Sequence, residues 1–136
     1  MFLLDTNIVS ELRKGERANN GVRQFAQQHS VDSFYLSVIT IMELRMGVLA
    51  LARKDAVQAR TIGEWLDNQI LRHFAGRILP ISLAIAERCA ALHVPDRRQE
   101  RDALIAATAL EHGLTVVTRN ERDFAPTGVG VVNPWI

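Results

Sequence analysis

Four acidic residues occupy positions where an α/β protein can build a catalytic site: Asp5, Glu43, Asp102 and Asp123. Asp5 directly follows the short apolar run Phe2–Leu4. Carboxylates gathered at one rim of a sheet repel one another and raise each other's pKa unless a cation keeps them ionised. A shell of carboxylates and water suits hard cations, and the four histidines show no ligand spacing, so we expect Mg²⁺ or Mn²⁺ here.

Such an ion activates water and stabilises charge on a phosphodiester oxygen, which suits hydrolysis of a nucleic-acid backbone. Hydroxyl and amide side chains at the same strand ends are candidates for positioning the water, the ligands or a phosphate, or for shaping the turns: Thr6, Asn7, Thr118 and Asn120. Cations near the acids in the sequence are candidates for phosphate contacts, since the guanidinium fork of arginine pairs two oxygens: Arg13, Lys14, Arg45, Arg97, Arg98, Arg101, Arg119 and Arg122. Arg119 and Arg122 are the preferred ones.

Each acid also has a purely structural explanation. Asp5 could cap the helix that follows it, and an acid in a first turn, such as Asp102, favours the helix dipole. Thr40 and Glu43 fit a capping box, and Asp123 could order a turn. Capping alone does not explain why all four acids stand beside predicted strand ends.

The elements that would position these acids alternate between strand and helix. Predicted strands cover residues 2–4, 34–39, 77–81, 114–118 and 129–132, with Pro80 placing the third at an edge. Predicted helices run from 6 to 15, 22–29, 40–52, 54–74, 82–92 and 102–112. This order implies an α/β fold, a parallel sheet with helices on both faces, whose ligands bind at the carboxyl strand ends near the reversal of strand order.

Composition and motifs exclude other classes. The 136 residues fit one domain, residues 1–136, and a net charge of +1 gives no footprint of a basic nucleic-acid binder. The chain shows neither a signal peptide nor a membrane span, and its lone Cys89 fits a reducing compartment, so we expect a cytoplasmic protein without membrane contact. It also lacks the G-x-S-x-G and G-x-x-x-x-G-K-[ST] motifs.

Four motifs carry a family resemblance: Leu4-Asp5-Thr6-Asn7, Met42-Glu43-Leu44, Asp102-Ala103-Leu104-Ile105-Ala106-Ala107-Thr108-Ala109, and Val117-Thr118-Arg119-Asn120 followed by Asp123-Phe124. In their order and spacing, the chain resembles PIN-domain proteins, specifically VapC-type toxins of the FitB-like branch. The resemblance runs from Met1 to Asn133-Pro134-Trp135. The charged loop Asp96–Arg101 is the least typical part, and its Asp96 and Glu100 are rivals of Asp102.

The resemblance implies a metal-dependent endoribonuclease, the toxin of a toxin–antitoxin pair, with a five-stranded three-layer PIN-like fold in strand order 3-2-1-4-5. The family's acids map onto Asp5, Glu43, Asp102 and Asp123. The resemblance also implies homodimers or dimers of dimers, an antitoxin partner, and operator DNA bound only through the antitoxin. Met42, Met46 and Leu49 would then form a contact surface, as would the helix that carries Trp65, with core packing as the alternative.

Two other functions remain open from the sequence. A haloacid-dehalogenase-like phosphatase also begins with a strand and an aspartate, but it needs a second acid where this chain has Asn7. A non-catalytic protein that binds an antitoxin or completes a DNA complex would not need the four acids.

Overall fold

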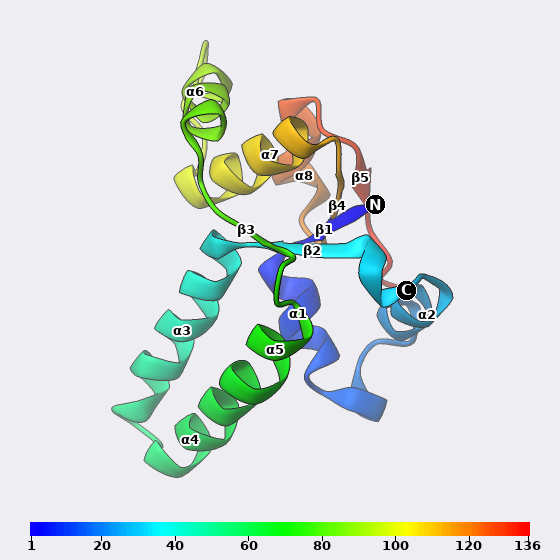
Figure 1. Cartoon of the computed structure of the whole chain (residues 1–136), viewed down its shortest axis with the longest axis vertical. Coiled ribbons are helices and arrows are strands. Elements are labelled where there is room, and N and C mark those ends of the chain that lie inside the picture. The colour runs from blue at the N-terminus through cyan, green and yellow to red at the C-terminus, as the bar shows by residue number, and fades with distance from the viewer.

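A parallel sheet of five short strands runs through the centre of the computed structural model, which describes residues Met1–Ile136 (Figure 1). The strands are β1 (Phe2–Leu4), β2 (Phe34–Ser37), β3 (Ile78–Leu79), β4 (Thr115–Val117) and β5 (Val131–Val132). Their order is β3-β2-β1-β4-β5, and every neighbouring pair is parallel. The predicted fold class and strand order are therefore confirmed, and the order reverses between β1 and β4.

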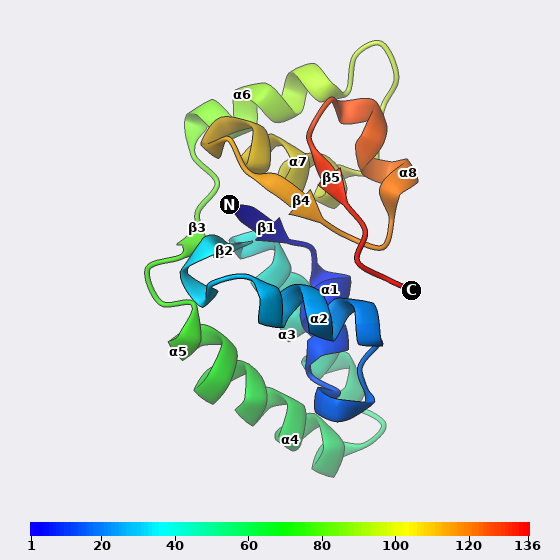
Figure 2. The same cartoon turned by 90° about the vertical axis from the view of Figure 1, so that its right-hand side faces the viewer.

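Helices cover both faces of this sheet. They are α1 (Thr6–Leu12), α2 (Asn20–Gln28), α3 (Val38–Ala52), α4 (Ala56–Trp65), α5 (Leu71–His73), α6 (Leu83–Leu92), α7 (Glu100–His112) and α8 (Glu121–Phe124). Figure 2 shows α6, α7 and α8 on one side of the strands and α1 to α5 on the other. None of the helices combines the length and the apolarity needed to cross a membrane.

The central strand β1 joins two apolar cores. Successive side chains of a strand point to opposite faces of the sheet. Leu3 accordingly packs with Ile105 of α7, and Leu4 packs with Ile8 of α1. Burial of one such side chain contributes about 1.5–3 kcal/mol, so packing on both faces fixes β1 and, with it, Asp5 at its carboxyl end.

The second strand is shorter than predicted, and the helix after it is longer. β2 ends at Ser37, whose Oγ accepts a hydrogen bond from the N–H of Ile39 at 3.0 Å and caps α3. The β-branched Val38 and Ile39 are therefore helical, although their type favours a strand. The predicted capping box of Thr40 and Glu43 is wrong, because the helix has already begun at Val38.

Most other elements match their predictions with small shifts. The helix predicted over 54–74 consists of α4, a π-helical turn over Leu66–Ile70 and α5. α7 begins two residues earlier than predicted, at Glu100, because Gln99 Oε1 accepts the N–H of Asp102 at 2.7 Å and caps the helix. Gly113, with φ of 66°, ends α7 as predicted. β3 is an edge strand, as Pro80 indicated.

Candidate active site

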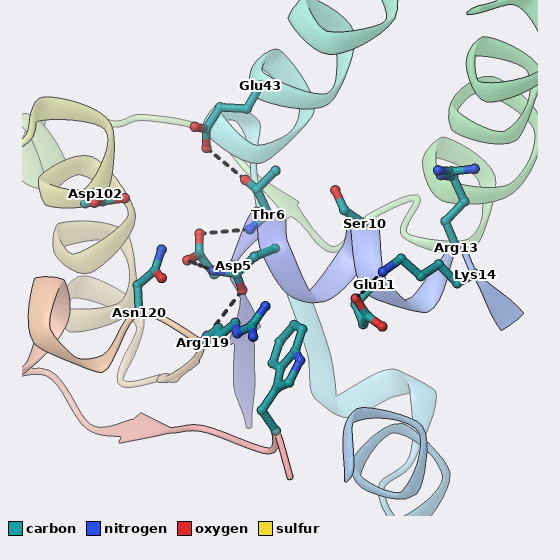
Figure 3. Close-up of a pocket in the computed structure, with 12 residues that line it drawn as sticks. Asp5, Thr6, Ser10, Glu11, Arg13, Lys14, Glu43, Asp102, Arg119 and Asn120 are labelled. Carbon is teal, nitrogen blue, oxygen red and sulfur yellow. Dashed lines mark hydrogen bonds and ion pairs between the residues drawn. The ribbon is translucent and has the colours of Figure 1, made fainter. Parts of the chain in front are cut away.

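A cleft of about 500 Å³ opens at the carboxyl ends of the central strands, where the strand order reverses. Three of the four predicted acids line it: Asp5 after β1, Glu43 on α3 and Asp102 on α7. Figure 3 shows the side chains of Asp5, Glu43 and Asp102 around the same space. The fold thus brings together residues from three segments that lie far apart in the sequence.

Asp5 is almost out of solvent, at 4% exposure, and both of its oxygens are engaged. Oδ1 accepts the backbone N–H of Thr6 at 2.8 Å, which caps α1. Oδ2 accepts the hydroxyl of Thr118 at 2.7 Å and the side-chain amide of Asn7 at 3.2 Å. Helix capping is therefore a real role of Asp5, and it accounts for only one of the two oxygens.

Thr118, Asn7 and Asn120 form a polar support beneath the cleft. The Thr118 hydroxyl, which donates to Asp5, also accepts the N–H of Asn120 at 2.9 Å. The amide oxygen of Asn7 accepts the N–H of Arg119 at 3.3 Å, so the loop after β4 is tied to the loop after β1. Three of the four predicted supporting residues are thus at the site.

Glu43 is held by hydroxyl and guanidinium groups from two other elements. Its Oε1 accepts the hydroxyl of Thr6 at 2.8 Å, and its Oε2 lies 3.5 Å from Nη1 of Arg101. The fourth supporting residue predicted from the sequence, Thr6, therefore positions Glu43 in addition to beginning α1. Arg101 connects α7 to α3 across the rim of the cleft.

Asp123 lies beside the cleft and not on its wall. It is exposed on α8 and borders a neighbouring polar cavity together with Asp102 and Arg122. Asp102 lines both cavities, so it connects Asp123 to the main cleft. The rival acids Asp96 and Glu100 line neither cavity. The structure therefore places Asp102, and not its rivals, at the site.

The acids disfavour one another's charge. Burial raises the pKa of Asp5, hydrogen bonds from its neighbours partly oppose this, and the charges of Glu43 and Asp123 raise the pKa further. Burial raises the pKa of Asp102 to about 6, together with the charges of the other three acids. A divalent cation in the cleft would lower the pKa of both Asp5 and Asp102, because its positive charge favours the ionised carboxylates.

The donor set fits a hard divalent cation, although its shell is not complete. It consists of carboxylate oxygens with hydroxyl and amide groups around them, which suits Mg²⁺ or Mn²⁺. No three Asp, Glu, His or Cys side chains are gathered closely enough to form a metal site by themselves. The acids flank the cleft, and coordination there would need water or a phosphate oxygen as further ligands.

Sequence analysis did not identify Ser10, Glu11 and Trp135 as site residues, and gave Arg13 and Lys14 only as arginine and lysine near an acid. All five line the cleft. Ser10 and Arg13 follow Thr6 by four and seven positions, and Glu11 and Lys14 follow Asn7 by the same intervals. The periodicity of α1 could therefore have found these four residues. Nothing local marks Trp135, which reaches the cleft only through the fold.

Comparisons with known proteins give one consistent family. The sequence pattern of the PIN domain family matches residues 2–129. VapC ribonuclease Y4jK of Sinorhizobium fredii is 36% identical over 141 residues, covering 99% of this chain and 98% of its own. Toxin FitB of Neisseria gonorrhoeae is 37% identical over 140 residues, covering 99% of both chains.

Solved structures agree with the sequence relatives. The crystal structure of FitAcB from Neisseria gonorrhoeae superposes with a TM-score of 0.90 at 37% identity, covering 99% of both chains. A structure of FitAB bound to an IR36 DNA fragment gives 0.89 at 35% identity, covering 100% of this chain and 96% of the other.

Proposed function

The chain belongs to the PIN-domain family, and on that premise we propose that it is the ribonuclease toxin of a toxin–antitoxin pair, which hydrolyses RNA phosphodiester bonds with the help of Mg²⁺ or Mn²⁺. The observation that carries the proposal is the meeting of Asp5, Glu43 and Asp102 in one cleft at the reversal of strand order. A full-length relative named as a ribonuclease supports it.

Asp5 and Asp102 are the residues that would hold the cation, with Glu43 beside them and Asp123 acting from the neighbouring cavity. When bound, the ion lowers the pKa of a coordinated water and stabilises charge on a phosphodiester oxygen. The chain itself supplies orientation, because Thr118 donates a hydrogen bond to Asp5 and keeps that carboxylate turned to the cleft.

Arginines beside the acids would bind the phosphate. Arg119 lines the main cleft, where its guanidinium N–H groups can donate to a phosphate oxygen. Arg122 borders the cavity of Asp102 and Asp123, so it would contact a phosphate on the other side of Asp102.

The partners follow from the family. A relative that is 35% identical occurs in a solved structure named as a toxin–antitoxin complex from Klebsiella pneumoniae, and the FitAB structure is bound to a DNA fragment. We expect an antitoxin for this chain too, with operator DNA bound through it, a cytoplasmic location, and a homodimer or a dimer of dimers. The exposed Met42, Met46 and Leu49, here called the α3 stripe, are the surface that we assign to the homodimer.

The proposal is tested by cleavage of RNA with purified protein freed of antitoxin. Wild type should cleave single-stranded RNA in millimolar Mg²⁺ or Mn²⁺ and lose cleavage in EDTA. Asp5→Asn should lose cleavage and remain folded by circular dichroism, because the amide still fills the space but cannot hold the cation with a charge. Asp96→Asn is the matched control and should cleave like wild type, because Asp96 does not line the cleft.

Retained cleavage in Asp5→Asn at saturating metal would refute the role given to Asp5. Absence of both divalent-ion binding and RNA cleavage in the wild type would instead favour a protein that acts only by binding its antitoxin.

A further inference from the structure

The cleft has an acidic end and a basic end. Figure 3 shows Asp102 and Glu43 on one side of Asp5, and Arg13 and Lys14 on the other side, beyond Ser10. The basic end is lined by Arg13, Lys14, Arg119 and Trp135, and its single carboxylate, Glu11, pairs with Lys14. The proposed hydrolysis at the acidic end therefore leaves this second half of the cleft without a role.

At the basic end, the guanidinium of Arg119 lies over the indole ring of Trp135. The guanidinium carbon of Arg119 lies 4.9 Å from the centre of the Trp135 ring. The backbone of Arg119 is fixed as well, because its N–H donates to Asn7. With one guanidinium face on the indole, the edge N–H groups of Arg119 stay available to a phosphate. Trp135 is half-buried against the core that contains Leu4 and Ile8, so the outer guanidinium face and the exposed part of the indole are the flat surface offered to the cleft.

Trp135 is held in place by contacts that a loose chain end would not have. The main-chain oxygen of Pro134 passes so close to Gly21 of α2 that a Cβ there would lie 2.0 Å from it. The Asn19 side chain bonds both the carbonyl oxygen and the N–H of Ile136, at 2.8 and 3.3 Å. Asn133 Oδ1 accepts the N–H of Trp135 at 3.0 Å. These contacts fix the backbone of Trp135, so the indole ring is held at the cleft.

The cations at this end are only partly neutralised. Glu11 pairs with Lys14 at 2.9 Å and also accepts the N–H of Asn19 at 2.8 Å. Arg13 and Arg119 have no carboxylate within ion-pair distance. The basic end therefore carries a net positive charge next to a flat aromatic surface, the combination with which proteins bind a single nucleic-acid strand.

We propose that the basic end is a nucleotide subsite for single-stranded RNA, in which an unpaired base stacks on the Arg119–Trp135 pair and the neighbouring phosphate binds Arg13. The inference rests on the proposed ribonuclease function and adds the way in which substrate is selected. RNA must be unpaired beside the cleaved bond, because a base within a duplex cannot turn its face to the indole.

Tryptophan fluorescence tests the stacking directly, because Trp65 and Trp135 are the two tryptophans of the chain. In an Asp5→Asn/Trp65→Phe background, Trp135 is the sole tryptophan and the RNA stays intact. Titration with a labelled single-stranded oligoribonucleotide in Mg²⁺ should change the Trp135 emission in step with the anisotropy of the label. Asp5→Asn/Trp135→Phe, which retains Trp65, is the matched control and should show a much smaller emission change, because Trp65 borders cavities beside Arg13 but does not line the cleft itself.

Affinity and salt dependence separate the two contacts. Loss of one stacked base in Trp135→Ala should weaken binding about tenfold, and Trp135→Phe should restore most of it. Arg13→Ala should lower the slope of log affinity against log salt by about 0.7, the value for one phosphate contact on a single strand. Arg53→Ala replaces an exposed arginine that does not line the cleft, and it should leave that slope unchanged.

Two results would overturn the subsite: RNA binding without a change in Trp135 emission, and an RNA affinity of Trp135→Ala equal to that of the wild type. If the wild type still cleaves RNA, the proposed function stands in either case. A Trp135→Ala variant that binds RNA normally but loses its antitoxin would also overturn the subsite and assign the surface to the protein partner. If the wild type cleaves no RNA, the proposed function fails first, and the subsite fails with it.

Discussion

Asp5 divides its two carboxylate oxygens between the start of a helix and the neighbouring strand. The bond to Thr6 is local and follows from the position of an aspartate before a helix. The bond from Thr118 joins residues 113 positions apart, so it depends on β1 and β4 being neighbours. The acid could therefore be predicted from the sequence, whereas its orientation could not.

Removing the charge of Asp102 should stabilise the metal-free protein at neutral pH. Its pKa in the folded state is about 6, against an ordinary value of 3.8. Stability is therefore lost as the pH rises from 3.8 through about 6, because the folded state gives up this proton less readily. In EDTA at neutral pH, Asp102→Asn should be more stable by about 1 kcal/mol after solvent screening, or about 3 °C in Tm.

Thermal melts at several pH values measure this effect. The gain should shrink towards pH 4 and below, where the carboxyl is protonated in both states. Millimolar Mg²⁺ should then raise the Tm of the wild type more than that of Asp102→Asn. Asp96→Asn serves as the control and should show neither effect; a pH-independent gain in Asp102→Asn would argue against charge repulsion as its cause.

At the scale of elements, Gly21→Ala should loosen the contact between α2 and the C-terminal segment. Alanine favours a helix by about 1 kcal/mol over glycine, but its Cβ would lie 2.0 Å from the oxygen of Pro134. We expect the clash to prevail, with a net loss of about 1–2 kcal/mol in urea unfolding. The emission of Trp135 in a Trp65→Phe background should shift towards that of an exposed indole.

Gly47→Ala is the matched control, because no atom lies within 4 Å of a Cβ at this position of α3. It should be neutral or stabilise the protein by up to about 1 kcal/mol. A Gly21→Ala variant as stable as Gly47→Ala, with unchanged emission, would show that the C-terminal segment can move without cost.

Element types could be predicted from the sequence more securely than the residues at which they begin. The start of α3 was missed because Val38 and Ile39 continue the β-branched pattern of β2, while the deciding signal is a single hydroxyl on Ser37. α7 was placed two residues late because its cap is Gln99, a residue type that is uncommon at that position.

At the scale of the molecule, the strand order decides which parts of the site were predictable. Asp5 after β1 and Thr118 after β4 could be expected to meet, because parallel strands end at the same edge of the sheet. The basic end could not, because Trp135 reaches it through the packing of Pro134 against Gly21, which no local pattern encodes. Charge alone did not distinguish Arg13 from the other exposed arginines.

The α3 stripe lies on the helix that also carries Glu43. Leu49 is 62% exposed there, and Met42 and Met46 lie beside it, so a second copy of the chain could cover all three. Leu49→Arg should weaken the homodimer about a hundredfold or more, because a buried unpaired charge is strongly unfavourable. Light scattering across a dilution series should then give a monomer mass, with little change in the circular dichroism. Leu83→Arg, at a leucine that is 79% exposed on α6, is the matched control and should remain dimeric. Dissociation by Leu83→Arg and not by Leu49→Arg would place the interface on the opposite layer of the fold.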